Sequence, residues 1–514
     1  MTEVAVVSSD LVRLRGLLTA TGPAMELRSP VTGQVMGELP TSTPADVEVG
    51  AQLAHRAQSE WAARPIDDRA RLLLDFHDHL LDRRDYFVDL LQSVGKDRLS
   101  AAEEVLHLAV TARYYGRTAR RYLHSERGEG VFPLLTRVDR NYVPKGLVGV
   151  IAPWNFPLTM AISDGLAALV AGNAIMLKPD HQTPLVALAA VELLRTAGLP
   201  ADVWQVVHGR GTVVGRELID VSDYVCFTGS TATGRMVATQ CAGRLIGCSL
   251  ELGGKNPLVI LDDADVEAAA EGAARASFSN AGQLCVSIER IYVVDQLFEP
   301  FTRAFVARTQ AIRLGNALDF EHDMGSLMNP GRLERVSAHV EDAKAKGATV
   351  LTGGRRREDL GELFYEPTIL TGVTPEMECY AEETFGPVVS VYAVADEDEA
   401  VARANESDYG LNASVWTSDH DRGRRVASKI KCGSVNVNEG FAATFGSIDA
   451  PMGGMKNSGL GRRQGQDGIR RFVEVQSVAT QTGIPIAPSH GLDGKSFTSV
   501  MTGVLRMMKK AGRA

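Results

Sequence analysis

The chain has 514 residues, of which 45% are hydrophobic and 23% charged, and its formal net charge is −9. This length predicts two or three domains, and the composition is ordinary for a globular protein. The acidic balance argues against nucleic-acid binding, which needs a concentrated basic surface. No run of eighteen apolar residues occurs, so no membrane span is expected.

The cysteines are few and irregularly spaced. Their positions are Cys226, Cys241, Cys248, Cys285, Cys379 and Cys432. This set is sparse for a disulfide scaffold and lacks paired metal-ligand spacing, so no metal site is predicted. The N-terminus mixes Glu3, Asp10 and Arg13 with apolar residues and lacks a signal-peptide core. A cytoplasmic location is therefore expected.

The N-terminal part is predicted to be mainly helical. Strand-like pieces and turns come first, and Thr43 followed by Pro44 then marks a helix start, with a hydroxyl N-cap and proline at the first helical position. Helical periodicity continues through Trp61, over residues 67–91 and over residues 100–122. Residues 124–144 break this pattern and predict a strand pair that leaves the main body.

From Gly146 onward, short apolar strands alternate with helices. The predicted strands of this stretch are residues 148–152, 174–178, 203–207 and 224–227, and the predicted helices are residues 160–171, 184–197 and 231–242. Such alternation indicates βαβ units and a parallel sheet with both faces covered. A second α/β region is predicted from Asn256 to about Asn438, with strands at 258–261, 290–294, 388–394 and 434–438. Ligand clefts usually lie at the junction of two such halves.

The C-terminal tail has apolar residues at helical spacing followed by cations. The apolar residues are Phe497, Val500, Met501, Val504, Leu505 and Met508, and the cations are Lys509, Lys510 and Arg513. Two interpretations are open: a helix that lies on a membrane surface, and a helix that packs on its own protein or a neighbouring subunit. The short basic part favours the second.

Three residues form a candidate catalytic set. Cys285 lies in the small-residue loop N-A-G-Q-L-C, Glu251 begins E-L-G-G-K, and Asn155 lies in P-W-N-F-P. A thiolate is a nucleophile, a carboxylate can act as a general base, and an amide can hold an oxyanion. Each residue alone has an ordinary alternative: a buried thiol, a surface charge and a turn.

In combination, these motifs resemble the aldehyde dehydrogenase superfamily from about Thr32 to about Val478. The matching motifs are P-W-N-F-P at 153–157, L-K-P at 177–179, F-T-G-S-x-x-x-G at 227–234, E-L-G-G-K-N-P at 251–257, G-Q-x-C at 282–285 and E-E-x-F-G-P at 382–387. The resemblance implies an α/β fold with a Rossmann-like cofactor domain, an α/β catalytic domain and a β oligomerisation arm. The implied boundaries are 1–123 with 146–253, 254–447, and 124–145 with 470–483, followed by the tail at 484–514. A homodimer or homotetramer is implied.

The resemblance also implies the chemistry. The Cys285 thiolate attacks an aldehyde, Asn155 and the Cys285 amide hold the oxyanion, hydride passes to the nicotinamide, and Glu251 activates water to hydrolyse the thioester. The presence of Glu251 points to a free acid as product, because enzymes of this superfamily that acylate coenzyme A generally lack it. The superfamily often has Gly-Arg-Glu where this chain has Gly461-Arg462-Arg463, which puts a proton relay through that glutamate in doubt.

The cofactor is expected to be NADP or NAD. Two glycine turns are candidates for the phosphates: Gly209, Gly211 and Gly215, and F-T-G-S with Gly229 and Ser230; the resemblance favours the second. It further implies contacts from Trp154, Lys178, Gly234, Leu252, Glu383 and Phe385. NAD-preferring members commonly have Glu where this chain has His181. A carboxylate there would repel a 2′-phosphate and an imidazole would not, so NADP is favoured.

The substrate is predicted from the wider resemblance. S-N-A-G-Q-L-C-x-S-I-E-R at 279–290 and D-Y-G-L-N-A-S-V-W at 408–416 are most similar to an actinobacterial type of succinate-semialdehyde dehydrogenase. Many members of that type have an arginine where this chain has Ser279, so a cation elsewhere must bind the carboxylate. The alternative is a less polar aliphatic or aromatic aldehyde in a tunnel lined by Trp154, Phe156, Phe278 and Phe441, each of which could equally be a core residue.

Overall fold

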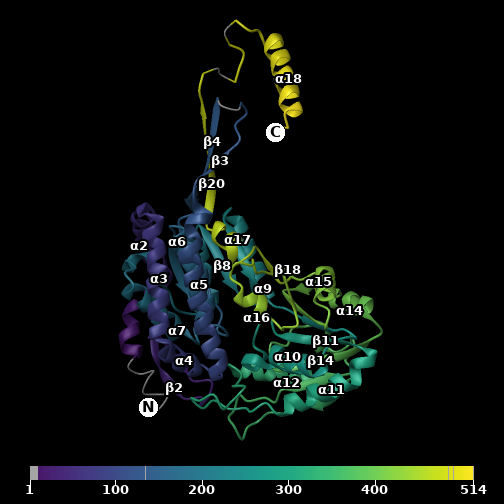
Figure 1. The fold of residues 1–514 in the computed structure, drawn as a ribbon. Coiled ribbons are helices and arrows are strands. Elements are labelled where there is room, and N and C mark those ends of the chain that lie inside the picture. Colours follow the sequence, from purple (N-terminus) through teal and green to yellow (C-terminus); the bar gives the residue numbers. More distant parts are fainter. Residues whose placement is uncertain (1–9, 133–134, 484–485, 490, 513–514) are drawn as a thin grey trace. The chain divides into compact units, whose positions relative to one another are not determined.

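The computed structural model describes residues 10–132, 135–483, 486–489 and 491–512 (Figure 1). It divides into a main unit, Met1–Tyr122 with Pro144–Phe472, and a minor unit, Leu123–Val143 with Val473–Ala514. The prediction about residues 1–9 lies outside the described part. Among the described residues, no helix is both long enough and apolar enough to cross a bilayer.

The first sheet of the main unit has six strands in the order β19-β9-β8-β5-β6-β7. Its strands are β5 (Leu147–Ile151), β6 (Ala174–Lys178), β7 (Trp204–Val206), β8 (Tyr224–Thr228), β9 (Gly247–Glu251) and β19 (Gly459–Leu460). All neighbours are parallel except β19, which is antiparallel to β9. The four predicted strands of this half are confirmed to within a residue or two at each end.

Strand β5, and β6 up to its last residue, Lys178, contain no polar side chain, because helices cover the sheet. Every residue of β5 and β6 is buried, as expected for a parallel sheet with both faces packed. Helices α6 (Thr159–Val170) and α2 (Pro44–Ala63) pack on β5 and β6. Thr43 caps α2 as predicted, and it forms a reciprocal capping box with Asp46. The remaining helices of this half are α7 (Pro184–Thr196), α8 (Arg216–Val221) and α9 (Thr231–Gly243).

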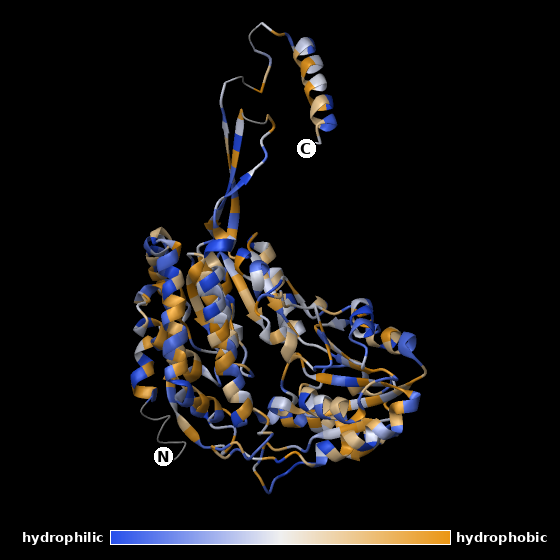
Figure 2. Ribbon diagram, in the orientation of Figure 1, coloured by the Kyte–Doolittle hydropathy of each residue, from blue (hydrophilic) through white to orange (hydrophobic). Residues whose placement is uncertain are grey.

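One predicted helix is wrong in its extent. Residues 67–91 form two helices, α3 (Ile66–Asp82) and α4 (Arg84–Gln92). The chain departs from helical geometry at Arg83, with φ −104° and ψ 18°, although the apolar spacing continues across the break. The next helix, α5 (Arg98–Leu123), agrees with the prediction. Helices α2, α3 and α5 each carry hydrophobic and hydrophilic residues, as expected for helices on a surface (Figure 2).

The second sheet of the main unit has seven strands in the order β12-β13-β14-β11-β10-β16-β17. Its strands are β10 (Asn256–Ile260), β11 (Ile288–Val294), β12 (Thr349–Thr352), β13 (Thr368–Thr371), β14 (Val388–Val394), β16 (Asn412–Trp416) and β17 (Ser434–Val437). Only β12 runs antiparallel to its neighbour. The accompanying helices are α10 (Val266–Phe278), α11 (Asp295–Gln310), α12 (Pro330–Ala345), α14 (Glu397–Asn405) and α15 (His420–Lys429).

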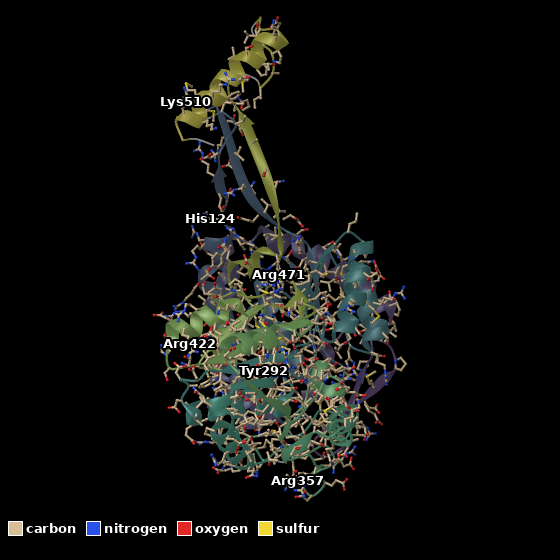
Figure 3. The ribbon with its side chains drawn as sticks, turned by 90° about the vertical axis from the view of Figure 1, so that its right-hand side faces the viewer. His124, Tyr292, Arg357, Arg422, Arg471 and Lys510 are labelled. Carbon is tan, nitrogen blue, oxygen red and sulfur yellow. The ribbon has the colours of Figure 1, made fainter. Side chains whose placement is uncertain are left out.

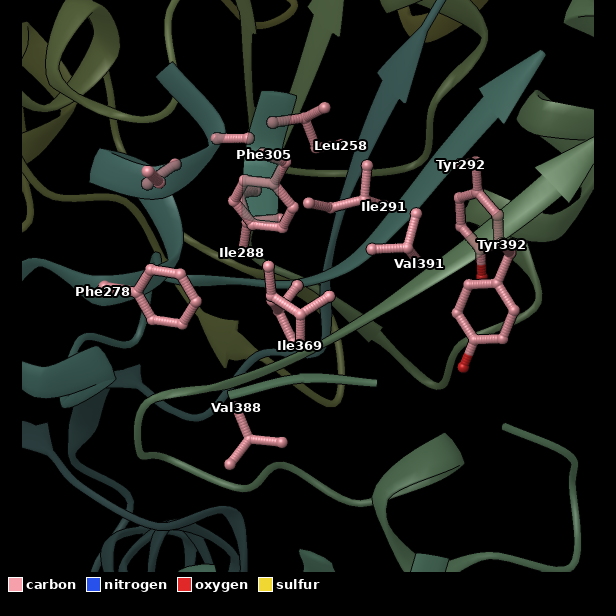
Figure 4. Close-up of a cluster of buried hydrophobic side chains, with 14 of the residues drawn as sticks. Leu258, Phe278, Ile288, Ile291, Tyr292, Phe305, Ile369, Val388, Val391 and Tyr392 are labelled. Carbon is pink, nitrogen blue, oxygen red and sulfur yellow. The ribbon is translucent and has the colours of Figure 1, made fainter. Parts of the chain in front are cut away.

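This second half has a continuous hydrophobic core (Figure 4). Leu258, Ile291 and Val391 come from adjacent strands and are at most 1% exposed. Phe278 stacks on Phe305 with ring centroids 6.0 Å apart. Such packing fixes the strands of this half, and Cys285 lies three residues before one of them, β11.

The minor unit contains a three-stranded sheet in the order β20-β4-β3. Its strands are β3 (Glu126–Gly128), β4 (Thr136–Pro144) and β20 (Val473–Gln481), and β3 and β4 are antiparallel, as the predicted strand pair requires. The predicted tail helix is α18 (Gly494–Lys510), none of whose described residues is buried. The assignment of the sheets to cofactor, catalytic and oligomerisation domains stays a prediction.

Candidate active site

The candidate site residues lie at the carboxyl ends of strands in the first sheet and at the amino ends of strands in the second sheet. In the first sheet, β5, β6, β8 and β9 end just before or at the motifs that contain Asn155, Lys178, Gly229 and Glu251. In the second sheet, Cys285 lies shortly before β11, and Glu383 shortly before β14. Carboxyl ends of parallel strands are the usual location of ligand sites in open α/β sheets.

The loop that carries Cys285 has an unusual backbone. Asn280, Ala281 and Gly282 have φ angles of 51°, 55° and 69°. Consecutive left-handed residues are rare, and one that is not glycine costs about 1–2 kcal/mol. Gly282 is required in addition for space, because a Cβ there would lie 2.2 Å from the carbonyl oxygen of Gly386. The loop is therefore held in place by its surroundings.

Side-chain amides hold this loop. Asn256 Nδ2 donates to the carbonyl oxygens of Cys285 and Ser287, each at 2.8 Å. Asn412 Nδ2 donates to the Val286 carbonyl at 2.9 Å, and Asn155 Nδ2 donates to the Gln283 carbonyl at 2.9 Å. We call the three asparagines Asn155, Asn256 and Asn412 the amide clamp. Through it, Asn155 and Cys285 are fixed relative to each other.

Cys285, Asn155 and Glu251 line one cavity of about 180 Å³. Six residues predicted to hold the cofactor line it too: Trp154, Gly229, Ser230, Leu252, Glu383 and Phe385. Lys178, His181 and Gly234 do not line this cavity. The structure thus brings together nine of the twelve predicted site residues in one space.

Burial raises the pKa values of both Cys285 and Glu251. Burial, reinforced by the carboxylates of Glu251 and Glu383, raises the pKa of the Cys285 thiol to about 12. Burial also raises the pKa of Glu251 to about 7, with Arg463 opposing this effect and Asp164 adding to it. The Oε1 atom of Glu251 is buried and has no hydrogen-bond partner among the described residues. The thiol is therefore protonated at neutral pH, and a carboxyl group on the same cavity titrates near neutrality.

Glu383 and Phe385 lie in a turn that a buried ion pair supports. Lys255 Nζ and Glu289 Oε2 are 2.5 Å apart, and both side chains are buried. Glu289 accepts the backbone N–H groups of Thr384 and Phe385 at 2.9 Å, where Phe385 has a φ of 54°. Glu383 in turn accepts the Gly254 N–H at 2.8 Å. Burial, reinforced by Glu289, raises the pKa of Glu383 to about 7.

The F-T-G-S turn opens helix α9 onto the cavity. Ser230 is the N-cap of this helix, and its Oγ accepts the Thr233 N–H at 3.3 Å. Gly234 permits close packing, since a Cβ there would lie 2.4 Å from Leu252 Cδ2. Backbone donors at the start of a helix favour a phosphate group. Because Gly229 and Ser230 also line the cavity, this end of α9 fits a dinucleotide.

Lys178 and His181 form a separate polar group at the end of β6. Lys178 is 3% exposed, and its Nζ donates to the Pro179 carbonyl at 3.1 Å. Asp180 Oδ1 lies 3.3 Å from His181 Nδ1. Burial lowers the pKa of His181; Asp180 opposes this effect, and Lys178 and Arg210 add to it. The alternative phosphate loop, Gly211–Gly215, forms a short π-helix beside Lys178.

A second cavity of about 240 Å³ shares Phe156, Leu284, Phe441 and Phe445 with the first. Trp154, Phe156 and Phe441 line these cavities as predicted, but Phe278 does not, because it packs in the core against Phe305. Among the described residues, Arg275 is the only Lys or Arg that lines the second cavity, and its Nη2 donates to Glu103 at 2.9 Å. Ser279 lies one helical turn away, and its Oγ donates to the Arg275 carbonyl.

Several residues of the site were not assigned a role from the sequence, among them Asn256, Lys255, Glu289 and Arg210. Glu289 and Arg290 interrupt the apolar strand I-E-R-I-Y-V-V, every residue of which is buried. Charged residues inside such a run are rarely buried without partners. That pattern could have indicated a buried ion pair, whereas the distant contacts of Asn256 and Arg210 have no local pattern.

Comparisons with known proteins agree with this geometry. A protein of Mycolicibacterium smegmatis, named provisionally as a succinate-semialdehyde dehydrogenase, NADP(+), is 47% identical over 98% of both chains. The crystal structure of an aldehyde dehydrogenase from Brucella melitensis biovar abortus has a TM-score of 0.85 and 35% identity, covering 90% of this chain and 95% of that one. Betaine aldehyde dehydrogenase from Staphylococcus aureus, in complex with NAD+, has a TM-score of 0.88 and 30% identity, covering 93% and 98%. The aldehyde dehydrogenase family matches residues 18–478, and the chain belongs to it.

Proposed function

We propose that this protein oxidises succinate semialdehyde to succinate with NADP as the preferred cofactor. The observation that carries the proposal is the single cavity lined by Cys285, Asn155 and Glu251. A nucleophile, an oxyanion donor and a general base in one space match the requirements of aldehyde oxidation through a covalent acyl group. The provisional name of the 47% identical relative supports the choice of substrate and cofactor.

Cys285 forms the bond to substrate. Its sulfur attacks the aldehyde carbon, and its proton passes to a base, because the thiol is protonated at neutral pH. Glu251 is the base available on the same cavity. The oxygen of the thiohemiacetal accepts hydrogen bonds from Asn155 Nδ2, whose first N–H already binds the Gln283 carbonyl, and from the Cys285 amide. The bound nicotinamide supplies the hydride acceptor for this oxidation.

Glu251 completes the reaction. The acyl group on the Cys285 sulfur is a thioester. After Glu251 has released the thiol proton to solvent, it takes a proton from water as the water oxygen bonds to the acyl carbon. Breaking the carbon–sulfur bond then releases the acid. With a pKa of about 7, about half of Glu251 is ionised at neutral pH and able to accept that proton.

The preference for NADP rests on the charges at the end of β6. Lys178 and Arg210 are cations close enough to influence His181, and Asp180 is the carboxylate beside it. A 2′-phosphate is attracted by such cations and would be repelled by a second carboxylate. Trp154, Leu252, Glu383 and Phe385 hold the nicotinamide end in this proposal.

Arg275 is the group that receives the carboxylate of succinate semialdehyde. It lines the second cavity one helical turn before Ser279 and has a guanidinium suited to bind a carboxylate. A broad-specificity aliphatic or aromatic aldehyde dehydrogenase is the second candidate, and the shared aromatic lining of Phe156, Phe441 and Phe445 favours it.

The functional test compares succinate semialdehyde with butyraldehyde, hexanal and benzaldehyde by NADPH formation. We expect succinate semialdehyde to have the highest kcat/KM, and no stimulation by coenzyme A. Cys285→Ala should lower the rate at least about 1,000-fold. Glu251→Gln should lower the steady rate about 100-fold. It should also slow, but not abolish, a first turnover of one NADPH per active site, because Glu251 serves as the base in both steps. A higher kcat/KM for hexanal or benzaldehyde would favour the second candidate.

Two further properties belong to the same proposal. The protein is a homodimer or homotetramer, and β20 supports this, because it is a nine-residue edge strand that is mostly exposed. It acts in the cytoplasm, where free thiols stay reduced; the six cysteines are all unpaired.

A further inference from the structure

Arg463 is a buried cation beside the catalytic cavity. It is 5% exposed, and its Nε donates to Asp164 Oδ1 at 3.0 Å and its Nη2 to Ser163 Oγ at 2.8 Å. Its third nitrogen, Nη1, meets only the sulfur of Met160, at 2.7 Å. Met160 lines both the catalytic cavity and a small cavity that Arg463 lines. One thioether therefore separates this guanidinium from the catalytic space.

Arg463 belongs to a three-membered charge cluster with Asp164 and Arg471. Arg471 Nη2 is 2.6 Å from the same Asp164 Oδ1, and its side chain is 9% exposed; Figure 3 shows Arg471 within the main unit. Burial raises the pKa of Asp164, but the two guanidinium groups outweigh it and lower that pKa overall. Two cations thus share one carboxylate, and the cluster has a net charge of +1.

The cluster is attached directly to the strand that carries Glu251. Strand β19 pairs with β9, with Gly459 opposite Glu251. Arg471 Nη1 donates to Ser249 Oγ at 2.9 Å, two residues before Glu251. The Glu251 carboxyl group also faces the segment before Arg463, since a Cβ at Gly453 would lie 3.2 Å from Glu251 Oε1 and 2.7 Å from the Gly461 carbonyl.

No hydrogen bond from the described residues to Oε1 stabilises Glu251 in its charged form, and burial favours the neutral acid. The charged groups around it are Arg462 and Arg463 after β19, Arg471 after α17 (Gly465–Arg470), and Asp164 on α6. Cys285 faces it as a neutral thiol, and Glu383 is a further acid on the cavity. Of these groups, Arg463 has the largest opposing effect on Glu251.

We propose that Arg463, Asp164 and Arg471 form a net-positive buried cluster that holds Glu251 as a carboxylate for hydrolysis of the acyl group, with Arg463 as the positioning residue. The inference rests on the proposed role of Glu251 as the base. The cluster takes no part in bond making: the water proton goes to Glu251, and the water oxygen goes to the acyl carbon. Arg463 acts only by making the charged form of Glu251 available near neutral pH.

The test is the pH dependence of kcat in a matched set of variants. In the wild type, kcat should fall as the pH drops through about 7, because Glu251 has a pKa of about 7 and must be ionised to act. We call this fall the acid limb. Arg463→Gln removes a positive charge, so the limb should move to higher pH by on the order of one unit. Asp164→Asn removes the opposing negative charge, so the limb should move to lower pH. Arg463→Lys should restore most of the wild-type profile, and Arg462→Gln should shift it less than Arg463→Gln.

Opposite shifts separate an electrostatic role from a structural one, because a loss of packing would move both variants alike. The inference is overturned if Arg463→Gln leaves the limb in place, or if Arg463→Gln and Asp164→Asn move it in the same direction. Should Arg463→Gln not fold, Asp164→Asn still decides the matter: a shift of its acid limb to lower pH supports the inference, and no shift or a shift to higher pH overturns it. Glu251→Gln separates the failure of the two proposals. If the acid limb of the kcat profile survives in Glu251→Gln, Glu251 is not the base. If that limb is lost in Glu251→Gln but unmoved in Arg463→Gln, only the role of Arg463 is excluded.

Discussion

At the scale of single residues, His181 is the position at which cofactor preference is most directly testable. Replacing His181 by Glu adds a negative charge next to Asp180, which already lies 3.3 Å from the ring. We expect the ratio of kcat/KM for NADP to that for NAD to fall at least about tenfold, because the added carboxylate repels the 2′-phosphate and can bind the ribose hydroxyls of NAD. Steady-state kinetics with both cofactors measure this ratio.

His181→Gln is the matched control, since it removes the imidazole without adding charge. Its ratio should stay within about threefold of the wild-type value, in line with the small effect of a neutral exchange. An unchanged ratio in His181→Glu would show that this position does not face the 2′-position of the cofactor.

At the scale of elements, Arg69 on α3 joins the ends of two other helices. Its guanidinium donates to the carbonyls of Val170, next to the end of α6, and of Ala62 and Arg64, at the end of α2. Arg69→Met would leave these buried carbonyls without their donor, and we expect a loss of about 3 kcal/mol in the free energy of unfolding. A lower urea midpoint would report it.

The control lies two residues away on the same helix. Arg71 is 70% exposed and has only a 3.7 Å contact with Asp68, so Arg71→Met should change stability by less than about 0.5 kcal/mol. Equal midpoints in the two variants would mean that the helix ends do not depend on Arg69.

At the scale of the whole molecule, β20 is the strand on which assembly is expected to depend. Val475 and Val478 are 59% and 42% exposed on this strand, and a three-stranded sheet with so little covered surface needs a partner for stability. We expect the double variant Val475→Lys/Val478→Lys to shift the protein toward monomers, because the added charges repel across a symmetric interface. Light scattering coupled to size-exclusion chromatography measures the mass.

A double variant of the main unit, Val49→Lys/Val213→Lys, adds the same charge at valines that are each 52% exposed. It should keep the wild-type mass. Loss of assembly in both variants would point to net charge rather than to β20.

The sequence predicted those parts of the protein that have a local pattern. The strand 388–394 and the α2 start at Thr43 are as predicted because apolar runs and capping residues act over a few neighbours. The break at Arg83 was not predicted, and the sequence left Phe278 open between tunnel and core, because each depends on contacts with distant parts of the chain. The same holds for the site: motifs indicated Cys285, Glu251 and Asn155, whereas Arg463 had been recognised only as a departure from the family pattern, and its ion pair with Asp164 spans 299 residues.

The amide clamp has a consequence for how this protein responds to its medium. Asparagine side chains neither gain nor lose protons at any ordinary pH, and salt screens their hydrogen bonds far less than it screens ion pairs. The sulfur of Cys285 is therefore held by groups that are indifferent to acidity and ionic strength, while Glu251 nearby is sensitive to acidity. The pH dependence of activity should therefore report the protonation of groups such as Glu251, and not a change in the position of the Cys285 loop.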